Sequence, residues 1–383
     1  MTARTPVAII RLDVAHQRHR KAAHLARWLG PWADAEATPE GVTRTTESLE
    51  LAGGGSIRCY RYEPARGGVS GTYVVAHGLH FAGPDDPRLD RFCRILASAG
   101  MLVIAPFIRA YTELRMAPSA AEDVGAAVDH AVKLSAQLGL PRPALFSISF
   151  GSTPVIEVAA SERHRDAVGA LVLFGGFFDF FATLRFTLTA RAFDDLASVV
   201  LPHDPVNAPA VFLNLAPHLE VPGDPETLVE AWRAMVHRSW SRPELRTAAR
   251  RWPIAEAIAA DLPEAQRELF FIGCDLLPGG AAHLEAGLAR AGDAFDFTRP
   301  ADKLARLAAP AVICHGRDDD VIPFTEAQKL REALAGDHPH RLHLTGLYGH
   351  TGTTLVDPSA LTAEVSAMLE MLYSVVDAPH EAL

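Results

Sequence analysis

The feature that most constrains the fold of this chain is a regular alternation of short apolar runs with amphipathic segments. The apolar runs cover residues 72–76, 101–106, 144–148 and 167–174. Between them, apolar residues recur every three or four positions, as in the stretch 88–99, which is the period of a helix with one buried face. Strands that alternate with helices build a parallel sheet covered on both faces. The sequence therefore predicts an α/β fold with a mostly parallel central sheet flanked by helices.

Other local patterns extend this prediction. Residues 6–29 are expected to form a helix, and residues 45–51 and 56–62 a β-hairpin joined by three consecutive glycines. Ser119 is followed three residues later by Glu122, which predicts a capping box at the start of the helix that Gly139 ends.

The alternation stops in the middle of the chain and resumes near its end. Residues 180–300 are mostly helical in pattern with proline-rich joints, and strand-like runs return at 309–315 and 341–345. The simplest organisation has three parts. They are an N-terminal helical segment (1–44), an α/β core (45–180 and 305–383) and a helical cap inserted into the core (181–304).

The net charge argues against a nucleic-acid partner, whereas the N-terminal residues are basic. The formal net charge of -10 argues against nucleic-acid binding, which usually needs a basic face. Residues 1–30 nevertheless carry six Lys or Arg against one Asp. A basic helix can lie on a membrane surface, but we favour a solvated helix packed on the acidic body. Formation of a homo-oligomer is left open.

Cysteine usage and hydropathy point to the cytoplasm. The four cysteines have no CxxC spacing, and Cys93 and Cys314 lie in apolar stretches, as buried free thiols do. No secretory signal is evident, and the longest apolar run, 167–178, is too short to span a bilayer. We therefore expect a cytoplasmic protein.

The first candidate for chemistry is Ser149, in the sequence Ser147-Ile148-Ser149-Phe150-Gly151 between a predicted strand and a predicted helix. A serine on such a tight turn projects its hydroxyl above the sheet edge, and small residues two positions to either side let strand and helix approach. The usual first glycine of this motif is replaced by Ser147. The helix start also favours an oxyanion beside the serine.

The second candidate is the run His77-Gly78-Leu79-His80 after the predicted strand 72–76. This turn can present the Leu79 N–H toward the serine, so that the Leu79 and Phe150 amides form an oxyanion hole. His77 can equally be a plain turn histidine. The H-x-x-H pair lacks a third ligand nearby, and we predict no metal site.

The remaining candidates follow the last two predicted strands. Asp318, Asp319 and Asp320 come after the strand that ends near 314, where an acid can orient an imidazole, although the same run could be a solvated acidic loop. His350 projects from a glycine-rich turn after the strand 341–345. Ser149, one of the aspartates and His350 all fall at the carboxyl ends of parallel strands, in the chain order Ser, Asp, His known for α/β-hydrolases.

The chain thus resembles the α/β-hydrolase superfamily over about residues 45–180 and 305–375. The residues that carry the resemblance are Ala76-His77-Gly78, the Ser147–Gly151 turn, Gly316-x-x-Asp319-x-x-x-Pro323 and Gly349-His350. The resemblance implies that Asp319 is the triad acid, with Asp179 as the fallback, since some members place the acid after the preceding strand. It also implies that the cap lies between strands six and seven.

The resemblance and the motifs together predict a serine hydrolase that cleaves a small, apolar carboxylic ester without a cofactor. We expect Ser149, Asp319 and His350 to be catalytic, and His77, Gly78, His80 and Phe178 to contact the substrate. Phe178 belongs to a phenylalanine-rich stretch at the start of the cap, which could equally be packed cap core. The alternatives are an acyltransferase or thioesterase with the same triad, and a non-catalytic ligand-binding protein on this fold.

Overall fold

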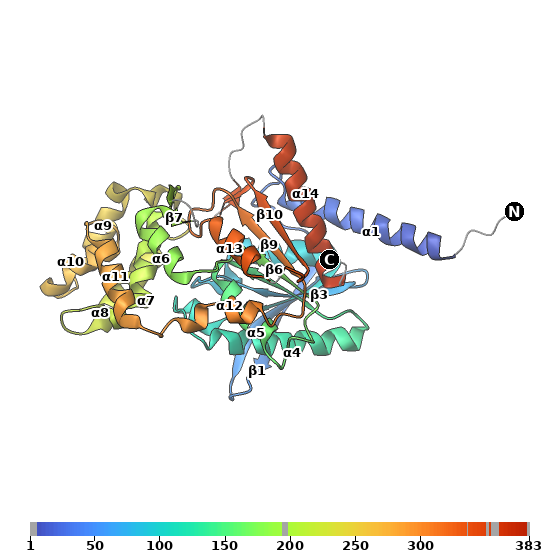
Figure 1. Cartoon of the computed structure of the whole chain (residues 1–383), viewed down its shortest axis with the longest axis horizontal. Coiled ribbons are helices and arrows are strands. Elements are labelled where there is room, and N and C mark those ends of the chain that lie inside the picture. Colours follow the sequence, from blue (N-terminus) through green and yellow to red (C-terminus); the bar gives the residue numbers. More distant parts are fainter. Residues whose placement is uncertain (1–5, 194–197, 335, 350–351, 354–359, 381–383) are drawn as a thin grey trace.

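The computed structural model describes the backbone of residues 6–193, 198–334, 336–349, 352–353 and 360–380. Its centre is an eight-stranded sheet in the order β1-β2-β4-β3-β5-β6-β9-β10 (Figure 1). The first three strands pair antiparallel, and every later pair is parallel. The predicted fold class is confirmed. The strands are β1 (Val42–Glu50), β2 (Ser56–Pro64), β3 (Gly71–Ala76), β4 (Met101–Pro106), β5 (Ala144–Ile148), β6 (Ala170–Phe174), β9 (Ala311–Gly316) and β10 (His340–Thr345).

Helices cover both faces of the sheet and leave the carboxyl ends of its parallel strands for the site. One face packs against α4, α5 and α13, and the other against α1, α2 and α14. Short helical turns join several of these elements. The covering helices are α1 (Pro6–Leu29), α2 (Pro87–Ser98), α4 (Ala120–Leu138), α5 (Ser152–Ala160), α13 (Thr325–Ala333) and α14 (Leu361–Asp377), with the short α3 (Arg109–Thr112) before α4.

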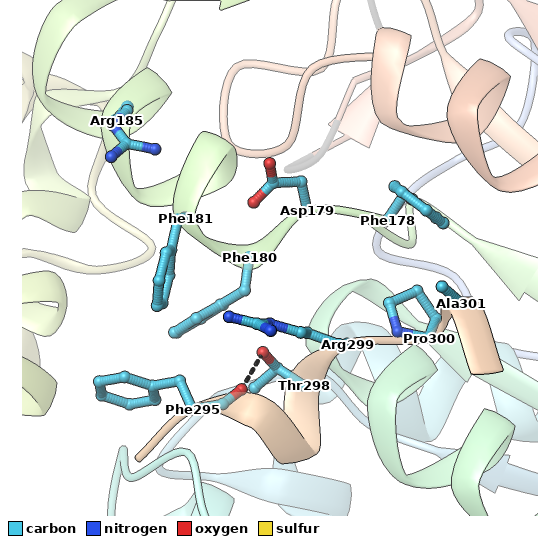
Figure 2. A pocket seen from close by; sticks show the side chains of 10 residues that line it. All are labelled: Phe178, Asp179, Phe180, Phe181, Arg185, Phe295, Thr298, Arg299, Pro300 and Ala301. Carbon is cyan, nitrogen blue, oxygen red and sulfur yellow. Dashed lines mark hydrogen bonds between the residues drawn. The ribbon is translucent and has the colours of Figure 1, made fainter. Parts of the chain in front are cut away.

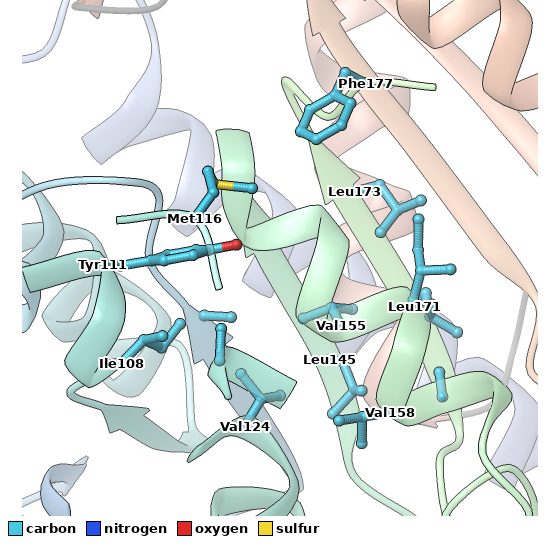
Figure 3. Packing of buried hydrophobic residues seen from close by; sticks show 14 of the residues in the cluster. Ile108, Tyr111, Met116, Val124, Leu145, Val155, Val158, Leu171, Leu173 and Phe177 are labelled. Carbon is cyan, nitrogen blue, oxygen red and sulfur yellow. The ribbon is translucent and has the colours of Figure 1, made fainter. Parts of the chain in front are cut away.

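Each central strand supplies both halves of the core because successive side chains point to opposite faces. In β5, Leu145 joins the cluster under α4 and α5, while its neighbours Ala144 and Phe146 join the cluster under α2. Strands buried on both faces must be apolar along their whole length, and this explains the continuous apolar runs in the sequence. Figure 3 shows Leu145 packed among Val124, Val155 and Leu171.

The segment between β6 and β9 is mainly helical and lies to one side of the sheet (Figure 1). It has its own apolar cluster around Trp232 and Phe270, and Val211 and Leu215 tie it to the core of the sheet. A two-stranded ribbon within it, β7 (Arg191–Phe193) with β8 (Ser198–Val200), was not expected from the sequence. The helices are α6 (Phe180–Thr189), α7 (Ala208–Leu215), α8 (Pro225–Ser239), α9 (Ala248–Ala259), α10 (Glu264–Gly273), α11 (Gly280–Ala291) and α12 (Ala301–Leu304).

The second half of α1 packs against the body. Leu25 is buried, and the Arg18 guanidinium donates two hydrogen bonds of 2.6 Å to the carboxylate of Asp377 on α14. This half of α1 is packed on the body, as the sequence interpretation expects. The other end of α1 extends away from the rest of the molecule (Figure 1).

The predicted capping box at the start of α4 is wrong. Ser119 has helical backbone angles, and its side chain caps no N–H. The Glu122 carboxylate instead accepts a hydrogen bond from the Gly53 N–H and pairs with Arg109. A tertiary contact with the β1–β2 turn has therefore displaced the local motif.

Two further expectations can be compared with the structure. All four cysteines are buried free thiols. Within the described residues, every helix is too short or too polar to cross a bilayer.

Replacement of Leu145 by Ala tests the core. Leu145 is fully buried, so Leu145→Ala should lower the free energy of unfolding by about 2–5 kcal/mol through lost burial and an unfilled cavity. The control is Leu138→Ala at the end of α4, where the side chain is 48% exposed and the effect should be small. Chemical denaturation of both variants makes the comparison, and equal losses would contradict the assigned core.

Candidate active site

Ser149 lies on a tight turn between β5 and α5. Its φ is +54°, a conformation that non-glycine residues rarely adopt, and its side chain is almost buried. A single 3-10 turn (Ser149–Gly151) leads directly into α5. Backbone strain of this kind persists only where the surroundings hold it, and it is characteristic of functional sites. The arrangement matches the strand-to-helix turn expected from the sequence.

Gly151 makes this turn possible. A Cβ atom at this position would lie 2.7 Å from the carbonyl oxygens of both Ala76 and His77 at the end of β3. Both neighbours are backbone atoms of a central strand, so they cannot move aside cheaply. The first turn of α5 is therefore packed directly on the end of β3, and a glycine is required there.

Gly78 brings the loop after β3 against the serine. A Cβ atom at Gly78 would lie 3.1 Å from the Ser149 Cβ and 3.5 Å from its Oγ. The backbone of Gly78 and Leu79 thus passes beside the serine side chain, where the sequence placed one donor of the oxyanion hole. The second expected donor, Phe150, directly follows Ser149 in the turn.

His77 orients this loop through its ring. The ring is buried, its Nδ1 lies 2.7 Å from the Gly78 carbonyl oxygen, and its Nε2 accepts a hydrogen bond of 3.0 Å from the Ile108 N–H. These partners require the neutral tautomer with the proton on Nδ1. Because C=O and N–H point in opposite directions across a trans peptide, holding the Gly78 carbonyl toward the ring turns the Leu79 N–H away from it.

Both ring nitrogens of His77 are thus engaged by the backbone, and contact of this residue with a substrate stays a prediction. Burial lowers the pKa of His77 to about 4, partly offset by the hydrogen bond to Gly78. The neutral form that the loop requires is therefore the stable one at neutral pH.

His80 lies further along the same loop, at the junction with the cap. Its ring stacks on Phe81 and on Trp240, which follows α8 of the cap. Its Nδ1 accepts a hydrogen bond from the Ala82 N–H, and its Nε2 lies 3.4 Å from the Asp86 carboxylate. Burial lowers the pKa of His80. This histidine joins core to cap, and contact with a substrate stays a prediction.

Asp319 is held at the carboxyl end of β9. Its Oδ1 accepts hydrogen bonds from the Val321 and Ile322 amides at 2.9 and 2.8 Å, and its side chain is only 4% exposed. The Nε2 of buried His315 lies 3.4 Å from its Oδ2 while donating to the Ile322 carbonyl at 2.8 Å. Several donors thus fix the carboxylate in one orientation.

The alternative acids are directed elsewhere. Asp318 is exposed, and Asp320 points to the cap, where Arg246 binds it. Asp179, the fallback, is exposed at the start of α6 and accepts a hydrogen bond from the Ala182 N–H as a helix cap. Asp319 is buried, and its carboxylate accepts from two backbone amides of the turn after β9.

His350 lies outside the described residues. The described residues before and after it pair with each other: β11 (Tyr348–Gly349) pairs with β12 (Gly352–Thr353), and β11 contacts β9. The Glu364 carboxylate of α14 accepts from the Gly346 N–H at 2.6 Å, and the Tyr348 hydroxyl donates to the Leu29 carbonyl at the end of α1. The base of this loop is therefore fixed beside the strand that precedes Asp319.

A cavity of about 290 Å³ opens where the core meets the cap (Figure 2). Phe178, Phe180, Phe181 and Phe295 line much of it, with Arg299 on one side. The ring of Phe150, next to Ser149, packs edge-on against Phe180 with 6.2 Å between ring centroids. One aromatic side chain thus links the serine turn to the wall of the cavity.

Sequence reasoning missed two residues that build this site. The buried Glu326 carboxylate accepts hydrogen bonds from the Phe178 and Asp179 amides at 3.0 and 2.6 Å, so it shapes the loop after β6. Buried Tyr111 donates its hydroxyl proton to the Phe150 carbonyl at 3.0 Å, which braces the serine turn. Neither belongs to a motif, so only the folded contacts identify them.

Within the part of the chain that the structure describes, no three histidine, cysteine or acidic side chains gather as metal ligands would. His77 and His80, the one H-x-x-H pair considered, are engaged with separate partners.

The buried His77 predicts a specific dependence of stability on pH. Its pKa is about 4 in the folded chain and about 6.5 when unfolded, so the unfolded chain binds more protons between these values. The stability that neutral His77 contributes is complete above pH 6.5 and is lost as the pH falls to 4, by about 3 kcal/mol at most.

His77→Gln provides the comparison because glutamine does not titrate in this range. The difference in free energy of unfolding between the native chain and His77→Gln should be largest near pH 7 and shrink toward pH 4. Denaturant unfolding at several pH values measures it. A difference that stays constant across this range would show that His77 is not held neutral by burial.

Comparison with known proteins finds a similarity in structure and none in sequence family. No family model matches the chain, and no curated protein matches it. Among solved structures, brefeldin A esterase, titled a bacterial homologue of human hormone-sensitive lipase, is 18% identical over 95% of this chain and 86% of its own, with a TM-score of 0.48.

Two archaeal structures are similar at the same level. An esterase from Pyrobaculum calidifontis is 15% identical over 97% of this chain and 94% of its own, with a TM-score of 0.46. An acylaminoacyl peptidase from Pyrococcus horikoshii is 10% identical over 88% of this chain and 41% of its own, with a TM-score of 0.44. Values this low carry no argument about activity. The chain's own sheet order, parallel strand crossovers and strand-to-helix turn at Ser149 are those of the α/β-hydrolase fold.

Proposed function

We propose that this protein is a serine hydrolase that cleaves a carboxylic ester through an acyl-enzyme on Ser149. The observation that carries the proposal is the strained turn at Ser149, packed between Gly151 and Gly78. A buried serine held at positive φ beside a loop of backbone amides has no evident structural purpose. The same arrangement is what a nucleophile beside an oxyanion hole requires.

In the proposed reaction, the Ser149 Oγ attacks the carbonyl carbon of the substrate while His350 removes its proton. Asp319 holds the imidazole in the required tautomer and stabilises its protonated form. His350 then gives the proton to the alcohol oxygen as its bond to the acyl carbon breaks. In the second half of the reaction His350 takes a proton from water, the water oxygen attacks the acyl carbon, and the proton passes to Ser149 Oγ as the acid is released. These steps use only side chains and backbone amides of this chain.

The Leu79 and Phe150 amides are the proposed donors to the tetrahedral oxyanion. Support comes from the Gly78 carbonyl, which His77 holds so that the Leu79 N–H faces the other way. Donors fixed before reaction stabilise the developing charge without reorganising, and each is worth roughly a hundredfold or more in rate. In this proposal His77 and Gly78 act by positioning the loop.

The substrate class follows from the cavity at the core–cap junction. Its volume of about 290 Å³ is small for a ligand site, and its phenylalanine walls favour an apolar or aromatic group. Arg185 at its rim is already paired with Glu285 by two hydrogen bonds. A short apolar or aromatic ester, with Phe178 against its acyl or alcohol group, fits these walls best.

Acyl transfer or thioester cleavage would use the same residues, and the pocket would choose the acceptor. Comparison of turnover in water with turnover in added alcohols, and of esters with thioesters, separates these reactions. A non-catalytic ligand-binding protein is the other candidate, but it would have no need of the strain at Ser149.

The first test is Ser149→Ala with a fluorophosphonate probe. The native chain should be labelled covalently and hydrolyse p-nitrophenyl esters, while the variant should lose labelling and about 10⁴-fold or more of its turnover. Ser161→Ala, on a serine beyond the end of α5, is the matched control and should behave as the native chain. Full esterase turnover in folded Ser149→Ala would refute the proposal.

The second test addresses the pocket. Phe178→Ala should enlarge the cavity and raise the ratio of kcat/KM for longer over shorter acyl chains by about tenfold, since each methylene in an apolar pocket is worth about 1–3 kcal/mol. Phe92→Ala, on α2 across the sheet, is the control for losing a half-buried phenyl ring. An unchanged chain-length preference would place the substrate elsewhere.

A further inference from the structure

The turn that carries Asp319 is tied to the cap by a cluster of charged groups. Arg246, at the end of η5 (Pro243–Arg246), donates from Nη2 to the Asp320 carboxylate at 2.6 Å. Its Nε lies 3.1 Å from the carboxylate of Asp204, just before the 3-10 turn Pro205–Asn207. The Asp204 N–H also donates to the Asp320 carbonyl at 2.9 Å. Two segments of the cap therefore hold one residue of the core.

The acids of this cluster require their cation. The side chains of Asp204 and Asp320 are almost buried, and the Arg246 guanidinium lies between them. Two carboxylates that share a buried site repel each other strongly, and a guanidinium fork neutralises both while satisfying their oxygens. Loss of Arg246 removes a positive charge that balances these two carboxylates.

Arg246 is itself positioned by a second, buried arginine. The guanidinium of Arg251 on α9 donates to the carbonyl oxygens of Leu245 and Arg246, at 3.3 and 2.7 Å, and to that of Asp275 at 3.1 Å. Its side chain is 2% exposed. The backbone that carries Arg246 is therefore anchored inside the cap, so its side chain presents a fixed contact to the core.

We infer that Arg246 is a positioning residue for catalysis, which aligns the triad acid Asp319 by holding Asp320 from the cap. The inference rests on the proposed function. Asp319 and Asp320 are adjacent and have different partners: Asp319 accepts from amides of its own turn, and Asp320 is bound by Arg246 of the cap. The contacts of Asp320 with Arg246 and Asp204 therefore hold, from the cap, the backbone that also carries Asp319. The cap in this scheme completes the catalytic geometry as well as covering the pocket.

This role predicts a distinctive kinetic result. Arg246 does not line the cavity, so Arg246→Gln should leave KM within about threefold of the native value. It should lower kcat by about 10- to 100-fold, since a displacement of about 1 Å at a catalytic group has this scale of effect. Arg246→Lys, which keeps the charge, should recover part of the loss.

A double-mutant cycle separates positioning from general loss of stability. Asp320→Asn removes the charge of one of the two carboxylates that Arg246 binds, and the pair Arg246→Gln with Asp320→Asn should lose less activity than the product of the two single losses. Arg290→Gln is the matched control because it breaks another cap ion pair, with Glu220, away from this turn, and its kcat should be unchanged. Thermal unfolding of each variant shows whether it is folded at the assay temperature.

The outcomes distinguish this inference from the proposed function. An unchanged kcat in folded Arg246→Gln, a change confined to KM, or multiplicative losses in the double variant would overturn the positioning role while Ser149→Ala stayed inactive. Full activity in Ser149→Ala would instead overturn the proposed function itself, whatever the behaviour of Arg246.

Discussion

The close approach of two backbones at the end of β3 and the start of α5 is the constraint on which the site depends. Gly151 is packed on the carbonyl oxygens that end β3, and Gly78 is packed on the Ser149 side chain. These contacts leave room only for a sharp turn, which holds the serine at positive φ. The proposed nucleophile and the proposed oxyanion loop are therefore placed by one steric requirement.

Buried polar side chains then fix the backbone around this turn. His77 holds the Gly78 carbonyl, Tyr111 holds the Phe150 carbonyl, and Glu326 holds two amides after β6. Such groups are costly to bury unless they are paired, and once paired they define a single conformation. The described backbone around the serine turn is thus held by buried hydrogen bonds, and the proposed stabilisation of a transition state needs such fixed donors.

The cap contacts two turns of the proposed site. Its aromatic cavity adjoins the ring of Phe150, and its arginine cluster contacts the residue after Asp319. The cap thus touches both the proposed nucleophile turn and the proposed acid turn. Under the proposed function, substrate selection and alignment of the triad would both depend on how the cap sits on the core.

Much of the fold and part of the site could be predicted from local sequence. Apolar runs of strand length, helical periods and the turn glycines locate the strands and helices of the core, because burial on both faces of a parallel sheet forces that pattern. The Ser147–Gly151 run also located the serine turn, since its small residues are a direct steric need. The prediction of a capping box at Ser119 was wrong, and the Glu122 carboxylate instead accepts a hydrogen bond from the Gly53 N–H.

What the sequence by itself determined was the class of fold and the position of the serine, since both follow from periods and spacings of adjacent residues. Only the tertiary structure decided which of three consecutive aspartates faces the sheet edge, that the His77 ring serves the backbone, and that Arg246 meets Asp320. The physical reason is that these roles depend on hydrogen-bond partners that folding brings together, in the case of Arg246 and Asp320 from 74 positions apart.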